Sequence, residues 1–168
     1  MGKIKDFKEL AERINALKQS GQIDLSTEED LSIGIMNLIS LEEHFFFSAE
    51  KTGKKEYFDM LAEVREMRKE LLGKLMDKNE AESWCISKHL LAGSMRLMEV
   101  GTKLQTQGDN MGSEDYFGKA YKLYAMFWAL RLQILSAGEL ESADLGVDGD
   151  KPWSAEDIVG KLVDCCKE

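Results

Sequence analysis

A single proline, Pro152, stands in this chain, so no proline interrupts the long stretch that precedes it. Along that stretch apolar residues recur at the 3.6-residue spacing of amphipathic helices. Turn-forming residues break the pattern at regular distances, at Gly21, at Thr52-Gly53, at Gly108-Asp109-Asn110 and again from Gly138 to Lys151. The sequence therefore predicts an all-α protein.

Four of the predicted helices are long and are joined by short connections. Short connections make consecutive helices antiparallel neighbours. We therefore predict an up-and-down four-helix bundle with accessory N- and C-terminal helices. The bundle helices are expected at residues 27–51, 55–77, 80–107 and 113–137.

The length of 168 residues is that of one domain, because domains typically run to about 100–200 residues. We divide this predicted single helical domain, residues 1–168, into four parts. They are an accessory helix at 1–20, the bundle at 27–137, an acidic linker at 138–152 and a C-terminal helix at 153–168.

The net charge, the apolar runs and the cysteine spacing indicate which partners and which cellular compartment are expected. A formal net charge of −9 disfavours nucleic acid, because the chain as a whole is repelled by a phosphate backbone. We find no apolar run of about 18 residues and no signal-like N-terminus, which predicts a cytoplasmic protein without a membrane partner. The cysteines, Cys85, Cys165 and Cys166, have neither disulfide-framework nor zinc-motif spacing.

A few charged side chains fall on otherwise apolar helix faces when each helix is projected at about 100° per residue. Glu42, Arg68 and Arg131 do so in the first, second and fourth bundle helices, and Glu42 is a candidate partner for Arg68. His89 lies on a polar strip of the third helix. Counting residues from the tight turns puts Arg68, His89 and Arg131 at the same height along the axis of the predicted bundle. Glu42 lies about one helical turn from that height, and Cys85 lies one turn from His89. We predict that Glu42, Arg68, His89 and Arg131 form a cluster.

Such a cluster has three interpretations, because buried charges must pair or meet a ligand. The first is an internal ion-pair network that sets the helix register. The second is a site for a small anion, because two or three cations face one carboxylate and arginine forks suit carboxylate or phosphate. The third is a metal site on Cys85 and His89, four residues apart, with Glu42 or Glu99 as a further ligand, although nearby arginines oppose a cation. No cofactor is predicted.

Residues 97–123, LMEVGTKLQTQGDNMGSEDYFGKAYKL, place large and small side chains at characteristic intervals. The set comprises Leu97, Val100-Gly101, Leu104, Ser113, Phe117 and Ala120. In these intervals the segment resembles one tetratricopeptide repeat. The resemblance implies two helices that approach closely at Gly101 and Ala120 with Phe117 between them, and it points to protein binding. Ala125 stands where the family's closing proline is expected, and no second copy follows at the period of about 34 residues, so a plain helical hairpin is the alternative.

Two aromatic residues, Phe47 and Trp128, point away from the main apolar stripes and are predicted interface residues. Self-association is the simplest use of such a patch. The chain has no Ser/His/Asp order, glycine-rich phosphate loop or His-Glu-x-x-His motif. We therefore predict a noncatalytic helical protein-interaction or scaffold module that engages itself or another protein. A bundle that binds a small anion or a metal is the alternative.

Overall fold

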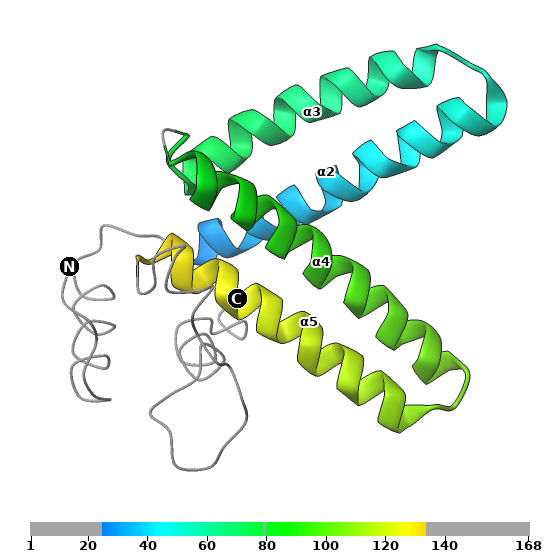
Figure 1. Ribbon diagram of the computed structural model, residues 1–168, viewed down its shortest axis with the longest axis vertical. Coiled ribbons are helices and arrows are strands. Elements are labelled where there is room, and N and C mark those ends of the chain that lie inside the picture. Colours follow the sequence, from blue (N-terminus) through cyan, green and yellow to red (C-terminus); the bar gives the residue numbers. More distant parts are fainter. Residues whose placement is uncertain (1–24, 79, 134–168) are drawn as a thin grey trace.

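The computed structural model describes residues 25–78 and 80–133. Within these ranges the chain forms four helices and no strand, so the all-α prediction is confirmed. Each predicted bundle helix corresponds to one observed helix. They are α2 (Leu25–Thr52), α3 (Glu56–Leu75), α4 (Ala81–Thr106) and α5 (Asn110–Arg131) (Figure 1). The predicted accessory helices at 1–20 and 153–168 and the linker at 138–152 lie outside the described residues.

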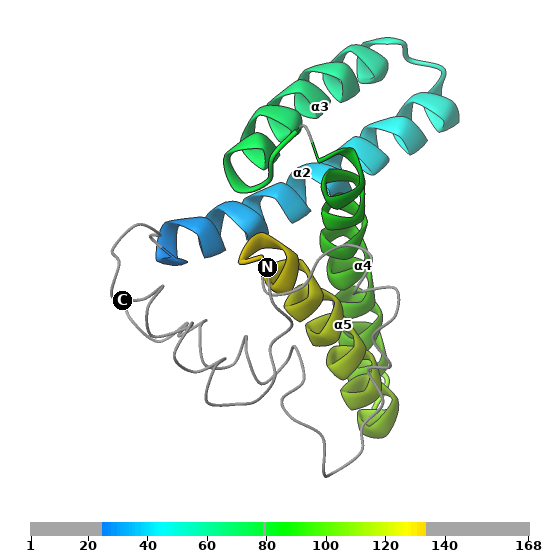
Figure 2. The ribbon, with the colours of Figure 1, turned by 60° about the vertical axis from the view of Figure 1, so that its left-hand side comes forward.

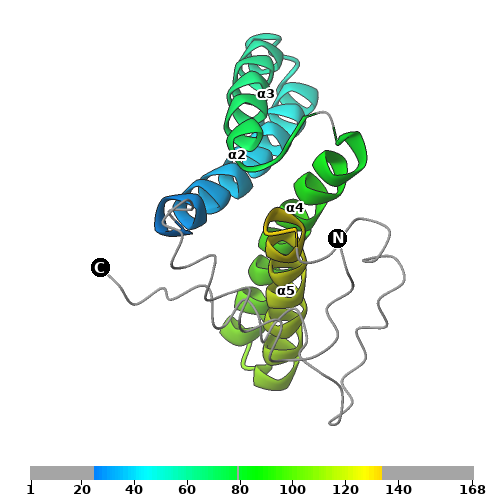
Figure 3. The same cartoon turned by 90° about the vertical axis from the view of Figure 1, so that its left-hand side faces the viewer.

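The four helices form two antiparallel hairpins that cross (Figure 1). One hairpin pairs α2 with α3 and the other pairs α4 with α5, and the two meet where α2 lies against α4 (Figure 2). Figure 3, a quarter turn away, shows the hairpins as two separate pairs. The predicted bundle is therefore present, with its two halves crossed instead of aligned over their full length. Gly53 and Gly108, with φ of 68° and 84°, lie in the hairpin turns, because glycine adopts positive φ without steric strain.

The hydrophobic core lies at this crossing. Its members come from the halves of the helices that meet there, namely the N-terminal halves of α2 and α4 and the C-terminal halves of α3 and α5. The buried core residues are Ile35, Met36, Leu72, Leu75, Met76, Leu90, Leu91, Ala125, Phe127, Trp128, Ala129, Leu130 and Leu132. Beyond the crossing each hairpin continues as a pair of helices. We call residues 41–67 the first arm and residues 98–120 the second arm.

Small residues let α4 and α5 pack closely along the second arm. A Cβ added at Gly101 would lie only 2.6 Å from the ring carbon Cδ1 of Phe117, so the ring occupies the space that a side chain would need. Closer to the crossing, the buried Ser94 hydroxyl donates a hydrogen bond of 2.9 Å to the carbonyl of Ala120. The close approach that the sequence predicts at Gly101 and Phe117 is present.

Helix α5 differs from its predicted range, 113–137, at both ends. It begins at Asn110, because the Asp109 side chain caps it by accepting a 2.9 Å hydrogen bond from the Gly112 amide. It ends at Arg131, because Gln133 has a positive φ of 54° and leaves the helical conformation. The predicted continuation of the helix through residues 132 and 133 is wrong, and no glycine or proline marks the observed end. The rest of the predicted range, residues 134–137, lies outside the described residues.

A helix that spans a membrane needs about 20 consecutive, mostly apolar residues. No helix within residues 25–78 and 80–133 is both long enough and apolar enough to do so.

Candidate functional site

An ion cluster on Glu42 lies between α2 and α3, at the base of the first arm. The Arg68 guanidinium donates to Glu42 twice, from Nε to Oε1 at 2.8 Å and from Nη2 to Oε2 at 3.3 Å. Arg65 adds a hydrogen bond from Nε to Oε2 at 3.0 Å. Glu42 and Arg68 are buried, with exposed fractions of 8% and 6%, whereas Arg65 is exposed. The pairing of Glu42 with Arg68 that the sequence indicates is present, with a second arginine beside it.

The charge of Glu42 is maintained by these arginines. Burial on its own would raise the pKa of the carboxyl group, because desolvation disfavours the charged form. Hydrogen bonds from Arg68 and Arg65, together with their positive charges, outweigh burial and hold the pKa of Glu42 below its ordinary value. Glu42 is therefore an ionised carboxylate at neutral pH.

A cavity of 390 Å³ opens next to this cluster, where α2, α3 and α4 meet, and we call it the junction cavity. Its polar lining residues are the Glu42 cluster, Glu43 of α2, and Lys88 and His89 of α4. Its apolar lining residues are Ile39, Phe46, Leu61 and Ala92. The structure thus brings three of the four predicted cluster residues, Glu42, Arg68 and His89, to one cavity.

Arg131 does not join them, and this part of the predicted cluster is wrong. Its guanidinium donates from Nη2 to Glu28 Oε1 at 2.6 Å, so α5 is tied at its C-terminal end to the first turns of α2. Arg131 also lines a different cavity, together with the end of α3. The counting of levels from the turns assumed four aligned helices, and crossed hairpins place the end of α5 elsewhere.

The two predicted interface residues have opposite environments. Trp128 is 1% exposed and packs in the core, with its ring edge-to-face against Phe127 at a centroid distance of 5.6 Å. As an interface residue it is a wrong prediction, because at the crossing α5 is covered on more than one side. Phe47 is 56% exposed on the first arm, and nothing within the described ranges covers it fully.

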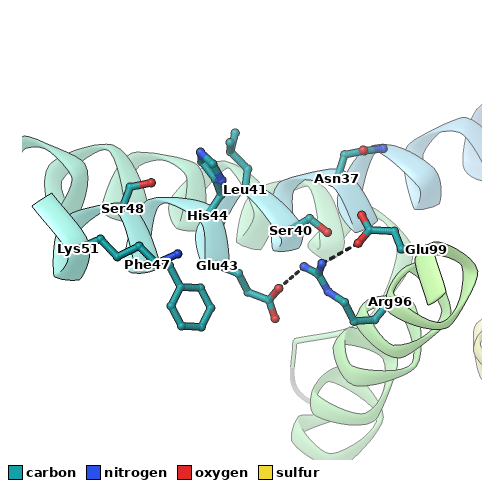
Figure 4. Close-up of a pocket in the computed structure, with 10 residues that line it drawn as sticks. All are labelled: Asn37, Ser40, Leu41, Glu43, His44, Phe47, Ser48, Lys51, Arg96 and Glu99. Carbon is teal, nitrogen blue, oxygen red and sulfur yellow. Dashed lines mark hydrogen bonds and ion pairs between the residues drawn. The ribbon is translucent and has the colours of Figure 1, made fainter. Parts of the chain in front are cut away.

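A second cavity, a groove of 820 Å³, lies between α2 and α4 on the side of Phe47. Figure 4 shows Arg96 of α4 between Glu43 of α2 and Glu99 of α4, and it forms ion pairs with both. The Phe47 ring stands at the edge of this groove, while His44 projects from another side of α2. The lining side chains therefore do not converge on one point, as the groups of a catalytic centre must.

Cys85 and His89 form no metal centre with their neighbours in the described ranges. Cys85 is an exposed free thiol, and no group of three or more His, Cys, Asp or Glu side chains suited to a metal occurs within residues 25–78 and 80–133. No hydrogen bond joins Cys85 to His89 there, so this pair does not form a nucleophile and base either.

Three charged residues of these sites escaped the sequence analysis. Arg65 lies three residues before Arg68, which puts both on one helix face, and this spacing was a usable signal. Lys88 and Glu28 carry no comparable signal. Lys88 reaches the junction cavity only because α4 crosses α2, and Glu28 meets Arg131 across the crossing.

Comparison with protein-family models, with curated proteins and with solved structures finds no match to this chain. The resemblance of residues 97–123 to a tetratricopeptide repeat stays a prediction. The structure therefore presents two candidate surfaces, a charged junction cavity and a first arm with exposed apolar side chains.

Proposed function

We propose that this protein is a noncatalytic helical interaction module that associates with a second copy of itself through the first arm. The observation that carries the proposal is the distribution of exposed apolar side chains. Ten large apolar side chains are exposed within the described ranges, and six of them lie on the first arm. They are Leu41, Phe46, Phe47, Phe58, Met60 and Met67.

The packing of the first arm explains why these side chains stay exposed. Phe45, Phe46 and Phe47 are consecutive in α2, so they point in directions about 100° apart and cannot all face α3. Phe45 stacks on Tyr57 of α3 at a centroid distance of 6.2 Å. Phe46 and Phe47 are left 45% and 56% exposed, edge-to-face with each other at 5.2 Å. Exposed apolar patches of this kind mark interaction surfaces.

The charges around Phe47 favour a second copy as the partner. The groove beside it is lined by two acidic residues, Glu43 and Glu99, and two basic residues, Lys51 and Arg96. A two-fold contact brings each patch against its own copy, so a patch of balanced charge avoids like-charge repulsion even though the whole chain carries −9. Self-association would therefore bury Phe47 beside charges of both signs.

Two further features belong to the same proposal. The second arm, with its tetratricopeptide-like packing of Gly101 against Phe117, supports a protein-binding role. A cytoplasmic location is supported by Cys85, because an exposed free thiol persists in a reducing compartment.

Sedimentation equilibrium of the full chain tests the proposal, with Phe47→Ser as the variant and Met111→Ser as the matched control. Met111 is 84% exposed but lies at the start of α5, away from the first arm. A two-fold interface buries Phe47 twice, so losing about 1 kcal/mol of apolar burial in each copy weakens the dimer roughly thirtyfold. Met111→Ser should leave the dissociation constant unchanged.

A wild-type protein that stays monomeric over the whole accessible concentration range would overturn the proposal. A dimer that Phe47→Ser does not weaken would overturn the assignment of the first arm as its interface. Circular dichroism of both variants verifies that their helical content equals that of the wild type.

A further inference from the structure

The junction cavity carries an excess of positive charge. Arg65, Arg68 and Lys88 line it, against the carboxylates of Glu42 and Glu43. Glu42 is shared by the two arginines, and Glu43 pairs with Arg96, which is itself shared with Glu99. The three cations and two carboxylates of the lining leave an excess of one positive charge in a partly enclosed site, where an uncompensated cation attracts a counter-ion.

Hydrogen-bond donors that line the junction cavity are available to a ligand. Within the described ranges Lys88 and His89 form no hydrogen bond or ion pair, and Arg65 uses only its Nε. Arg68 is buried, with a side chain 7% exposed, and is fixed by its two hydrogen bonds to Glu42. The two guanidiniums are thus positioned before any ligand arrives, which lowers the entropic cost of binding.

Apolar side chains also line the junction cavity. They include Ile39 and Phe46 of α2 and Leu61 of α3, and the volume of 390 Å³ lies within the range of small-molecule sites, about 300–1,000 Å³. A ligand that suits this mixed lining has both an anionic group and an apolar group. A phosphate monoester has three strong acceptor oxygens, which can accept hydrogen bonds from Lys88 and from the unused guanidinium nitrogens of Arg65 together.

We propose that the junction cavity binds a small phosphate monoester, with the phosphate on Arg65 and Lys88 and the organic group against Ile39, Phe46 and Leu61. This inference goes beyond the proposed function, although Phe46 belongs both to the exposed aromatic pair and to the lining of the junction cavity. Phe47 does not line the cavity, so Phe47→Ser should leave ligand binding unchanged. The two proposals can therefore fail separately.

Isothermal titration calorimetry of the full chain with phenyl phosphate tests the inference, with inorganic phosphate and benzoate as comparison probes. Phenyl phosphate should bind more tightly than either probe, because each of them lacks one of the two matching groups. Lys88→Met should weaken phenyl phosphate about tenfold or more, the effect of losing one charge-assisted hydrogen bond. Lys103→Met, an exposed lysine on the same helix, is the matched control and should bind as the wild type does.

Phe46→Ser tests the apolar contact independently of the charged one. This variant should weaken the binding of phenyl phosphate and leave the binding of inorganic phosphate unaffected. Lys88 has no partner to lose among residues 25–78 and 80–133, so Lys88→Met should fold normally, which a thermal melt verifies. Absence of binding, equal binding of phenyl phosphate and inorganic phosphate, or equal effects of Lys88→Met and Lys103→Met would each overturn the inference. Lys88-dependent binding to phosphatidic acid vesicles without binding of soluble phenyl phosphate would place the phosphate on a lipid and also overturn it.

Discussion

At the scale of single residues, the Glu42 cluster shows how a buried charge is tolerated. A carboxylate that is 8% exposed would be strongly destabilising alone, and it is retained because two guanidiniums supply three hydrogen bonds. Replacing one member of a buried pair leaves the other charge uncompensated. Glu42 therefore contributes to stability because its removal would leave the buried charge of Arg68 uncompensated.

The first prediction concerns the substitution Glu42→Gln, which keeps the shape of the side chain and removes its charge. We expect the free energy of unfolding to fall by about 2–3 kcal/mol, because Arg68 loses its charged partner in a buried position. The control is Glu43→Gln, whose side chain is 49% exposed and pairs with Arg96, and it should change stability by less than about 1 kcal/mol. Urea unfolding measures both, and equal effects would contradict the structural role of the cluster.

The lowered pKa of Glu42 adds a pH dependence to the same comparison. A carboxyl group whose pKa is lower in the folded state than its ordinary value of 4.5 contributes stability above that pH. The contribution is lost as the pH falls through the folded-state pKa. The difference in unfolding free energy between wild type and Glu42→Gln should thus be full at about pH 7 and shrink below about pH 4.5. Urea unfolding across this range measures it, and a difference that grows on acidification would reverse the assigned sign.

At the scale of helices, the two hairpins are stabilised in different ways. The hairpin of α4 and α5 uses small residues, with Phe117 seated against Gly101 and Ser94 bonded to Ala120. The hairpin of α2 and α3 uses the ion cluster and leaves aromatic side chains exposed. Close packing buries apolar surface within the pair of α4 and α5, whereas the pair of α2 and α3 leaves large apolar side chains exposed.

Two glycines of the second arm should respond in opposite ways to replacement by alanine. Gly101→Ala should lower stability by about 1 kcal/mol, because the new Cβ meets the Phe117 ring at 2.6 Å and this overpacking outweighs the gain in helix propensity. Gly118→Ala should instead raise stability by up to about 1 kcal/mol, since no heavy atom lies within 4 Å of the added Cβ. Thermal unfolding of both variants measures the effects. A Gly101→Ala protein as stable as Gly118→Ala would show that the helices do not approach so closely.

At the scale of the whole molecule, one core at the crossing supports two arms. Within the described ranges, every buried member of the core cluster lies in the helix halves that meet there or one residue beyond their ends. In the same part of the chain each arm consists of only two helices, so the backbone hydrogen bonds of the arms have less apolar cover. Regions with little buried apolar surface open locally at lower free energy than the core does.

Hydrogen exchange measured by mass spectrometry tests this division. Peptides around Leu72, Leu91 and Ala129 should exchange slowest, because these residues are buried at the crossing. Peptides near the arm tips, around Thr52 and Thr106, should exchange faster by at least about tenfold. The Phe47→Ser variant is the appropriate sample, because dimer formation would add protection to the first arm. Uniform protection along all four helices would contradict a core confined to the crossing.

The local pattern of the sequence was enough to predict the four helices and the inward Glu42 and Arg68. Periodicity reports which side of a helix is apolar, and it placed these two charges on the buried side. The close approach at Gly101 was implied by the resemblance of residues 97–123 to a tetratricopeptide repeat, and a glycine facing an aromatic residue across a hairpin is likewise a local arrangement. The ends of α5 were not predicted correctly from this pattern, since the Asp109 cap and the conformation of Gln133 depend on individual backbone angles.

The sequence by itself determined the all-α class, the two hairpins and the apolar side of each helix, because these depend on neighbours within a few turns of chain. Only the tertiary structure decided how the hairpins meet. The crossing angle depends on the packing of side chains that lie far apart in sequence. Because of that angle, Arg131 pairs with Glu28 and Trp128 is buried. The same angle places Lys88 at the junction cavity and leaves Phe47 exposed.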